Sequence, residues 1–258
     1  MLSDTIEPFF QELTRHSAAV IKPFFQHHEL KVERKGDDTP VTLADRQAEK
    51  VMRDLINKHY PRHGIIGEEF GEENSGAEFV WVLDPIDGTI SFTHGCPLFG
   101  TLLCLLHEGR PIAGCIQQPI LDQFLFGDGE KTTLNGRPVR VRETTQLSQA
   151  TLLTTDLQNI TRYQDRAAFD ALAAEVNLFR TWGDCYGYFL LGAGFADIMV
   201  DPIVNPWDIL PVIPIIEGAG GIITTWQGGD PVEGNSLVAS NRFIHARVLE
   251  KLQEGLVG

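Results

Sequence analysis

Two stretches near the start of the chain have the hydrophobic spacing of surface helices. From residue 4 to residue 28 apolar side chains recur every three or four positions, which predicts an amphipathic helix. The same spacing over residues 44–60 predicts a second helix, and Pro61 follows its end. Residues 32–42 are polar and contain glycine and proline, so we expect a loop or a short hairpin between the helices.

Short apolar runs dominate the next part of the chain and predict strands. The run over residues 78–83 is almost continuously apolar and β-rich, which indicates a strand covered on both faces. The Asn135-Gly136 pair is typical of the turn in a β-hairpin. Further strands are expected over residues 98–106, 114–118, 123–126 and 139–142.

Beyond about residue 145 predicted strands alternate with predicted helices. The alternation favours a layered α/β architecture, with residues 1–145 and 146–258 as two halves of one integrated fold. A late apolar helix contains Pro211 and Pro214, and the pattern leaves open whether these prolines kink it. The other elements expected here are strands over residues 151–155, 178–181 and 198–200 and helices over residues 162–176 and 186–194.

Composition and charge exclude two classes of partner. The chain has 258 residues, enough to bury a large core without disulfides. Lys and Arg number 21 and Asp and Glu number 35, so the formal net charge is −14. Nucleic acids and anionic lipids attract basic patches, so we expect neither as a partner, whereas a site for cations is compatible with this charge. No apolar stretch approaches the roughly 20 residues of a membrane span.

The cysteines and the N-terminal segment favour a reducing compartment. The four cysteines have neither C-x-x-C nor zinc-site spacing, so we expect free and mostly buried thiols. The first residues lack the basic segment and apolar run of a secretory signal. A cytoplasmic location is therefore expected.

Candidate chemistry begins with the segment Asp84-Pro85-Ile86-Asp87-Gly88-Thr89, directly after the apolar run that ends at Leu83. The two carboxylates and the Ile86 carbonyl could converge on one point at the end of a buried strand, where α/β sheets place ligands. Such hard oxygen ligands suit Mg²⁺, and no thiolate or imidazole lies beside them to favour zinc. Taken alone, the segment is equally typical of a surface turn.

Three other acidic motifs are also ambiguous when each is taken alone. Glu68 belongs to a pair of glutamates that would ordinarily be solvated. Asp208 follows Pro206-Trp207 and suits the first turn of a helix, where the helix dipole favours an acid. Asp45 follows Thr42 by three positions, which is the spacing of a capping box in its Asp form.

Together and in this order, the motifs resemble the inositol monophosphatase-like family of Mg²⁺-dependent, lithium-sensitive phosphatases, which includes fructose-1,6-bisphosphatase. The resemblance covers about residues 5–250 and rests on Gly67-Glu68-Glu69, WVLDPIDGT over residues 81–89, Pro206-Trp207-Asp208 and the Glu217–Gly221 segment. It implies a five-layer αβαβα sandwich, a homodimer and a phosphomonoesterase acting on a small phosphorylated metabolite. Two or three Mg²⁺ ions per site are implied, with Mn²⁺ as an alternative metal and Li⁺ as an inhibitor.

The resemblance also implies roles for individual residues. Asp45 would orient the Thr89 hydroxyl, which with Glu68 helps to activate a water on the metal. Gly88 and Thr89 would donate hydrogen bonds to the phosphate. Lys35 matches a family lysine, although its spacing to Asp45 is one residue shorter than usual. The implied metal ligands are Glu68, Asp84, the Ile86 carbonyl, Asp87 and Asp208, so the N-terminal half supplies most of them.

The segment WGDCYGY over residues 182–188 is similar to the histidinol-phosphate phosphatase branch of the family. The Asp184 carboxylate suits a substrate with a cationic amine, such as L-histidinol phosphate in histidine biosynthesis, whereas inositol is a neutral polyol. Asp201 is aligned with a family acid on the leaving-group side of the substrate, Asn205 lies near it in sequence, and Trp182 is expected beside the substrate ring.

Simpler interpretations of this segment stay open. Asp184 could be an exposed helix cap, and the aromatic residues could be core. Hydrolysis of inositol 1-phosphate or a related sugar or nucleotide phosphate is the alternative activity. A non-catalytic scaffold is disfavoured because every expected ligand is present. Cys185 is not expected to act as a nucleophile, since no histidine lies near it in sequence.

Overall fold

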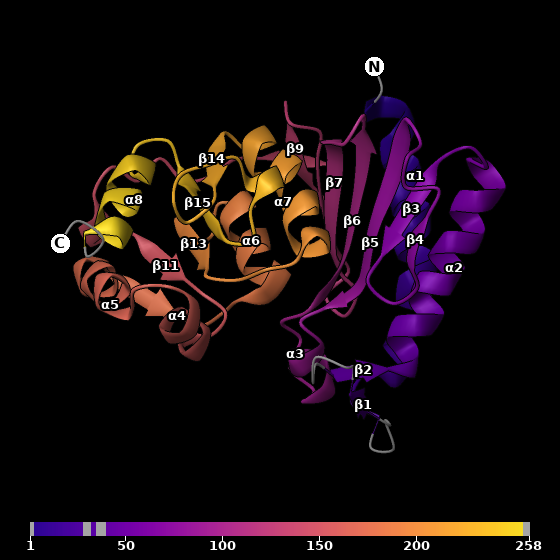
Figure 1. Cartoon of the computed structure of the whole chain (residues 1–258), viewed down its shortest axis with the longest axis horizontal. Helices are drawn as coiled ribbons and strands as arrows, with labels where there is room; N and C mark the ends of the chain where they lie inside the picture. The colour runs from indigo at the N-terminus through magenta and orange to yellow at the C-terminus, as the bar shows by residue number, and fades with distance from the viewer. Residues whose placement is uncertain (1–2, 28–31, 35–39, 255–258) are drawn as a thin grey trace.

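The computed structural model of the protein describes residues 3–27, 32–34 and 40–254 and arranges them in five layers. From one side of Figure 1 to the other these are helices, an eight-stranded sheet, two central helices, a five-stranded sheet and a last layer of helices. The expected five-layer α/β sandwich is therefore confirmed.

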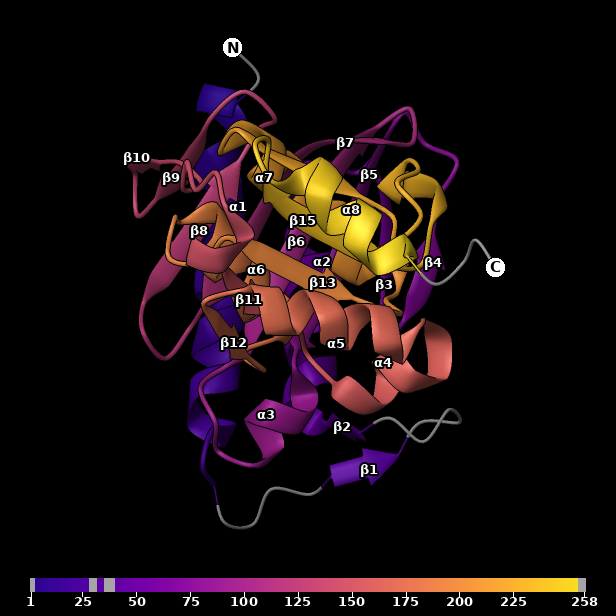
Figure 2. The same cartoon turned by 90° about the vertical axis from the view of Figure 1, so that its left-hand side faces the viewer.

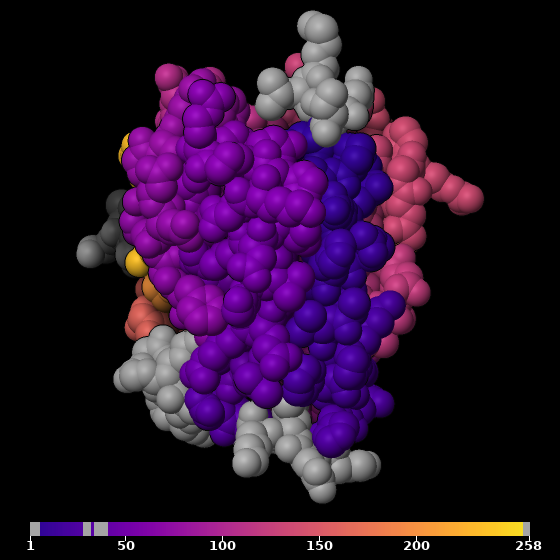
Figure 3. All heavy atoms as spheres, turned by 90° about the vertical axis from the view of Figure 1, so that its right-hand side faces the viewer, coloured from indigo at the N-terminus to yellow at the C-terminus, as the bar shows by residue number. Residues whose placement is uncertain are grey.

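The first outer layer consists of α1 (Ser3–Ile21) and α2 (Leu43–His59), which pack on the eight-stranded sheet. Figure 3 shows this outer face in indigo and purple, the colours of the first part of the chain. Helix α1 gives way to a 3₁₀ turn, Lys22–Phe24, earlier than expected, because Pro23 has no N–H to continue the α-helical hydrogen bonds. The expected hairpin is present as β1 (Val32–Arg34) and β2 (Pro40–Thr42).

The eight-stranded sheet has the order β10-β9-β8-β7-β6-β5-β3-β4 and is antiparallel except where β3 pairs with β5. The predicted hairpin turn lies between β9 and β10, with φ of 49° at Asn135 and 75° at Gly136. The prediction of a strand over residues 139–142 is wrong, because the chain leaves the sheet after Val139 and the Val141 N–H donates to the Ala219 carbonyl at 3.0 Å. The strands are β3 (Gly64–Gly67), β4 (Gly71–Glu73), β5 (Phe79–Asp87), β6 (Gly100–His107), β7 (Arg110–Gln118), β8 (Gln123–Gly127), β9 (Thr132–Leu134) and β10 (Arg137–Val139).

The five-stranded sheet has the order β12-β11-β13-β15-β14, and the helices α4, α5 and α8 cover its outer face (Figure 2). The prediction of a single helix over residues 162–176 is wrong, because this range spans the end of α4 and all of α5. The Asp165 carboxylate caps a new helix by accepting the N–H groups of Ala167 and Ala168 at 2.8 and 3.2 Å. The elements are β11 (Thr151–Leu153), α4 (Leu157–Tyr163), α5 (Arg166–Glu175), β12 (Leu178–Arg180), β13 (Ile198–Asp201), β14 (Gly221–Thr224), β15 (Leu237–Asn241) and α8 (His245–Gln253).

The central layer contains α6 (Asp184–Gly192) and α7 (Pro206–Gly218), and α7 continues through both of its internal prolines. Pro214 cannot donate to the Leu210 carbonyl, and the Cys104 thiol approaches this carbonyl at 3.4 Å instead. Gly114 of β7 faces the Pro211 backbone so closely that a Cβ atom would collide with it. The helix therefore lies directly against the eight-stranded sheet, and its first turn is held over the carboxyl end of β5.

Within the described residues, the helices are too short or too polar to cross a membrane. All four cysteines are free, and three of them are buried, as expected. The division of the chain at residue 145 stays a prediction; it falls between β10 in one sheet and β11 in the other.

Candidate active site

A β-bulge in β5 places Asp84 and Asp87 on the same side of the sheet. The strand does not end at Leu83 as expected but continues to Asp87, and its register against β6 shifts between the two aspartates. In a regular strand, residues three apart face opposite sides, and an extra residue in a bulge removes that alternation. The Thr101 hydroxyl holds the bulge from β6 by donating to the Pro85 carbonyl at 2.8 Å.

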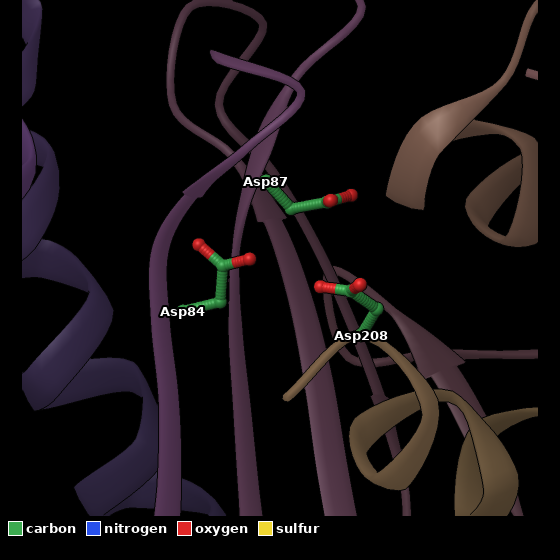
Figure 4. Close-up of side chains that lie close together, drawn as sticks. All are labelled: Asp84, Asp87 and Asp208. Atoms are coloured by element: carbon green, nitrogen blue, oxygen red, sulfur yellow. The ribbon is translucent and has the colours of Figure 1, made fainter. Parts of the chain in front are cut away.

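The third carboxylate comes from the first turn of α7. The Asn205 N–H donates to Asp208 Oδ2 at 2.8 Å, which fixes the direction of the Asp208 side chain. One oxygen of each of Asp84, Asp87 and Asp208 lies within 4.8 Å of the others, and Figure 4 shows the three groups pointing toward one another. The fold thus brings together acids that are more than a hundred positions apart in the sequence.

Burial, together with the crowding of these carboxylates, raises their pKa values. Burial is the main cause at Asp84, and the charges of Glu68, Asp87 and Asp208 raise its pKa further, well above the ordinary range. Burial and the charges of Asp208 and Asp184 likewise raise the pKa of Asp87 well above that range. The pKa of Asp208 rises to about 7, mainly through burial. Ionising all these groups at neutral pH therefore requires a compensating positive charge.

Glu68, Ile86 and Thr89 lie around this cluster. Glu68 follows β3, its N–H donates to the Leu83 carbonyl at 3.1 Å, and its charge acts on both Asp84 and Asp208. The Thr89 hydroxyl donates to the Ile86 carbonyl at 3.0 Å. Thr89 is the first residue of α3 (Thr89–Thr93), which follows Gly88 in the left-handed conformation with φ of 86°.

Asp45 lies in the capping box that the sequence suggested as its simpler role. Its Oδ2 accepts the Thr42 N–H at 2.8 Å and the Thr42 hydroxyl at 2.6 Å at the start of α2. Burial raises the pKa of Asp45 to about 7, and the charges of Glu69 and Glu68 contribute. The role of Asp45 in orienting Thr89 stays a prediction, and Lys35 lies outside the described residues.

A cavity of about 490 Å³ adjoins the acidic cluster. Asp87 and Asp208 line it together with three residues expected at the substrate, namely Asp184, Asp201 and Asn205. Trp182 is 43% exposed and is not one of the lining residues, so its contact with a substrate ring stays a prediction. Sequence reasoning missed the part of the lining that comes from α4 and the residues before it: Thr155, Asp156, Asn159 and Tyr163. Tyr188 of α6, for which the sequence left core packing open, also lines the cavity.

Asp184 begins α6 and lies beside Gly88 instead of forming an exposed cap. A Cβ atom on Gly88 would lie 3.0 Å from Asp184 Oδ2, so this glycine allows the carboxylate to approach the phosphate-binding turn implied by the resemblance. The Asp184 N–H donates to the Thr155 hydroxyl at 2.8 Å, and Ser91 donates to the carboxylate at 3.4 Å. Burial raises the pKa of Asp184 to about 6.

Asp201 is a second acid of the cavity and is held by neighbouring donors. Its carboxylate accepts the Tyr188 hydroxyl at 3.0 Å and the Thr155 N–H at 3.2 Å. Burial is the main reason that the pKa of Asp201 rises to about 7. The cavity therefore has an Asp184–Asp201 wall beside the three-aspartate cluster, and Asp156 is a further acid in its lining.

Comparison with known proteins identifies the family. The model of the inositol monophosphatase family matches residues 3–256. The chain belongs to the inositol monophosphatase family. It is 37% identical to the histidinol-phosphatase of Chlorobaculum parvum over 95% of each chain, and 34% identical to that of Mycobacterium tuberculosis over 88% of this chain and 90% of the relative. The solved structure of an inositol monophosphatase from Zymomonas mobilis aligns with a TM-score of 0.87 at 33% identity, covering 98% of this chain and 99% of that one.

The donor set of this inositol monophosphatase family member fits a hard divalent cation. Its converging atoms are the carboxylate oxygens of three aspartates with raised pKa values. Mg²⁺ prefers such ligands, whereas zinc sites more often use thiolates and imidazoles. The residues that the structure brings together to hold such a metal are Asp84, Asp87 and Asp208, and the expected ligand roles of Glu68 and the Ile86 carbonyl stay predictions.

Cys185 contacts Asp87 through its backbone and its thiol, which lies 3.9 Å from the Asp87 carbonyl. Its N–H donates to Asp87 Oδ2, which anchors the start of α6 beside the cluster. Burial and the neighbouring Asp87 charge raise the pKa of the Cys185 thiol well above its ordinary value, and a protonated thiol is a poor nucleophile.

The crowded carboxylates predict that the metal-free protein loses stability as the pH rises. Because Asp84, Asp87 and Asp208 have raised pKa values, the folded state binds their protons more tightly than the unfolded chain does. The stabilising contribution of the Asp208 proton is complete below about pH 4 and is lost as the pH rises through about 7. The contributions of Asp84 and Asp87 are also lost as the pH rises, because their pKa values are shifted in the same direction. Mg²⁺ competes with these protons, so we expect it to raise Tm by about 5 to 10 °C at about pH 8 and much less at about pH 5.

Differential scanning fluorimetry in EDTA and in millimolar Mg²⁺, at both pH values, measures this effect. The matched variant is Asp208→Asn, which removes one charge and keeps the side-chain shape. We expect it to be more stable than the wild type in EDTA at the higher pH and to gain less from Mg²⁺. An equal Mg²⁺ effect at both pH values would contradict the prediction.

Proposed function

We propose that this phosphatase hydrolyses L-histidinol phosphate to L-histidinol and phosphate with Mg²⁺. The observation that carries the proposal is the position of Asp184, whose carboxylate lines the same cavity as Asp87 and Asp208. A monoester bound with its phosphate at the aspartate cluster would have its other end in this cavity. An ammonium group there gains an ion pair with Asp184, which a neutral polyol cannot form.

The metal centre serves the phosphate end of the substrate. When bound, divalent ions neutralise the phosphate, lower the pKa of water and stabilise the leaving oxygen. Glu68 lies beside the cluster and is suited to accept a proton from the attacking water. In this proposal Gly88 and Thr89, at the start of α3, donate to the phosphate oxygens, and Asp45 supports the start of α2.

The second wall of the cavity serves the cationic end. Asp201 is held by Tyr188 and Thr155, so it presents a fixed carboxylate without needing to reorganise on binding. Asn205 also lines the cavity and its backbone positions Asp208. The similarity to histidinol-phosphatases supports the same substrate, since those relatives cover almost the whole chain.

The discriminating experiment is a substrate panel with purified protein and Mg²⁺. We expect kcat/KM for L-histidinol phosphate to exceed that for inositol 1-phosphate by at least about tenfold, and phosphate release to stop in EDTA. The alternative, an inositol or related sugar or nucleotide phosphatase, is favoured by the similarity to the inositol monophosphatase of Zymomonas mobilis. Preference for the inositol ester would overturn the substrate and keep the phosphatase class; no release from any ester would indicate a scaffold.

The proposal extends to assembly, inhibition and cellular setting. We infer a homodimer that works in the cytoplasm in histidine biosynthesis, accepts Mn²⁺ in place of Mg²⁺ and is inhibited by Li⁺. The four free cysteines are compatible with a reducing compartment. Light scattering of the purified protein measures the oligomeric state, and a monomeric mass would contradict the dimer.

A further inference from the structure

The residue Glu68 lies in a short connection that needs an external support. Residues 68–70 join β3 to β4, and Gly67 pairs with Gly71 across the base of the hairpin. Strand β4 is the edge of the eight-stranded sheet, and its three residues are exposed. Edge strands are held by one neighbour only, so the sheet alone constrains this connection weakly.

A buried carboxylate on α2 binds the backbone of this connection. Glu49 is fully buried; its Oε2 accepts the Glu69 N–H at 2.7 Å and its Oε1 accepts the Phe70 N–H at 3.2 Å. These are the two N–H groups that directly follow Glu68. Hydrogen bonds from amides to a carboxylate are stronger than those between neutral groups, so they fix the course of the backbone here.

Arg53 completes the support one helical turn later. Its Nε donates to Glu49 Oε1 at 2.8 Å, and its guanidinium also donates to the Gly71 carbonyl. The hydrogen bonds of the Glu49–Arg53 pair therefore hold the backbone from Glu69 to Gly71. Gly67 is required for this packing, because a Cβ atom there would collide with the Glu49 carboxylate.

We propose that Glu49 is a positioning residue for the metal centre, acting through the backbone that directly follows Glu68. It makes no contact with the three-aspartate cluster, but it determines where the Glu68 carboxylate lies relative to Asp84 and Asp208. Helix α2 thus carries two carboxylates with separate tasks, Asp45 at its first turn and Glu49 in its interior. The inference rests on the proposed metal-dependent function but not on the identity of the ester.

The test replaces Glu49 with glutamine, which keeps the shape of the side chain. One carboxylate oxygen becomes an NH₂ group, which cannot accept a hydrogen bond from the Glu69 or Phe70 N–H. We expect E49Q to bind Mg²⁺ about tenfold or more weakly by isothermal titration calorimetry, in the range found when groups that support metal ligands are altered. The rise in Tm caused by Mg²⁺ should shrink in parallel. For turnover of the preferred ester, kcat at fixed Mg²⁺ should fall while KM stays within about twofold, because the substrate wall is untouched.

The matched control is Asp197→Asn. Asp197 is also a fully buried carboxylate that accepts an arginine, Arg142, and a backbone N–H, that of Thr151 at 2.8 Å, but it lies outside the cluster and the cavity. D197N should lower Tm without changing the Mg²⁺ affinity. If E49Q keeps wild-type Mg²⁺ affinity, or if D197N weakens it equally, the positioning role is overturned.

Two further outcomes, a variant that does not fold and a wild type that does not bind Mg²⁺, can be told apart from a failure of the positioning role. If E49Q does not fold, E49D supplies the test, because it keeps the charge beside Arg53 but retracts the carboxylate by one methylene from the two amides. A weaker Mg²⁺ affinity in E49D supports the proposal, and an unchanged affinity overturns it. Failure of the wild type to bind Mg²⁺ would overturn the proposed function and this inference together, whereas a different preferred ester would leave the inference standing.

Discussion

Replacing Asp84 with asparagine should abolish phosphatase activity while leaving the fold intact. The asparagine side chain fills the same volume and can still accept the Ile86 N–H, which Asp84 Oδ1 now accepts at 3.0 Å. The change removes a negative charge from a buried cluster in which Glu68, Asp87 and Asp208 all repel it. We therefore expect metal-free D84N to be at least as stable as the wild type at about pH 8, where the charges are most costly.

Activity should respond in the opposite direction from stability. The lost carboxylate is at the centre of the candidate ligand set, so we expect kcat/KM to fall by about 10³-fold or more in saturating Mg²⁺. Initial rates of phosphate release and circular dichroism of the same preparation measure both properties. Asp54→Asn, on the exposed side of α2 where Asp54 pairs with Lys50, is the control and should keep full activity. Residual turnover in D84N above about one tenth of the wild type would exclude Asp84 as an essential ligand.

The parts of the fold that were predicted correctly depend on local patterns. The hydrophobic spacing over residues 44–60 matches α2, since one face of that helix is buried over its whole length. The Asn135-Gly136 pair matches its turn because both residues accept the positive φ that a tight hairpin requires. One missed boundary also had a local signal, since Asp165 is a good helix cap within the range expected as one helix.

The end of β5 could not be predicted locally. Pro85 and Gly88 are typical turn residues, and only the partner strand β6 shows that the chain continues in the sheet with a bulge. The Thr101 hydroxyl that holds the Pro85 carbonyl is remote in sequence and carries no motif. The course of α7 could not be predicted locally either. Pro214 leaves the Leu210 carbonyl without its helical donor, and the thiol that approaches this carbonyl is that of Cys104 in the sheet.

In the candidate site, too, some features could be predicted from the sequence and others depend on contacts between distant segments. Its acidic motifs were found through the family resemblance, since no local pattern shows that these distant segments lie close together. The structure brings Asp84, Asp87 and Asp208 together. The α4 side of the cavity and the role of Glu49 were missed, since a buried glutamate at a helical position has no sequence signature. Trp182 was expected beside the substrate ring on the basis of its neighbours; its side chain is 43% exposed, and this contact stays a prediction.

Replacing Asp184 with asparagine should reduce activity toward L-histidinol phosphate selectively. In D184N the backbone N–H of this residue can keep its bond to Thr155, and the side chain can keep its place beside Gly88, so the architecture of the cavity should survive. The loss is the charge that pairs with the substrate ammonium. Breaking a buried charge pair costs about 2 to 5 kcal/mol, so kcat/KM should fall by at least about 30-fold.

The comparison with inositol 1-phosphate makes this prediction specific. A neutral polyol forms no ion pair with Asp184, so its kcat/KM should stay within about threefold of the wild type in D184N. Asp165→Asn, in the cap of α5 and outside the cavity lining, is the control and should change neither substrate. Rates with both esters across a range of Mg²⁺ concentrations separate substrate binding from metal binding.

An equal loss for both esters would assign Asp184 to the metal centre instead. That outcome has a physical basis, because the Asp184 charge acts on Asp87 and Asp208 and its carboxylate packs against Gly88. The Mg²⁺ dependence would then shift in D184N, as it should in E49Q. A selective loss at unchanged Mg²⁺ dependence therefore requires Asp184 to act on the substrate itself, since only one of the two esters carries an ammonium group for this carboxylate to bind.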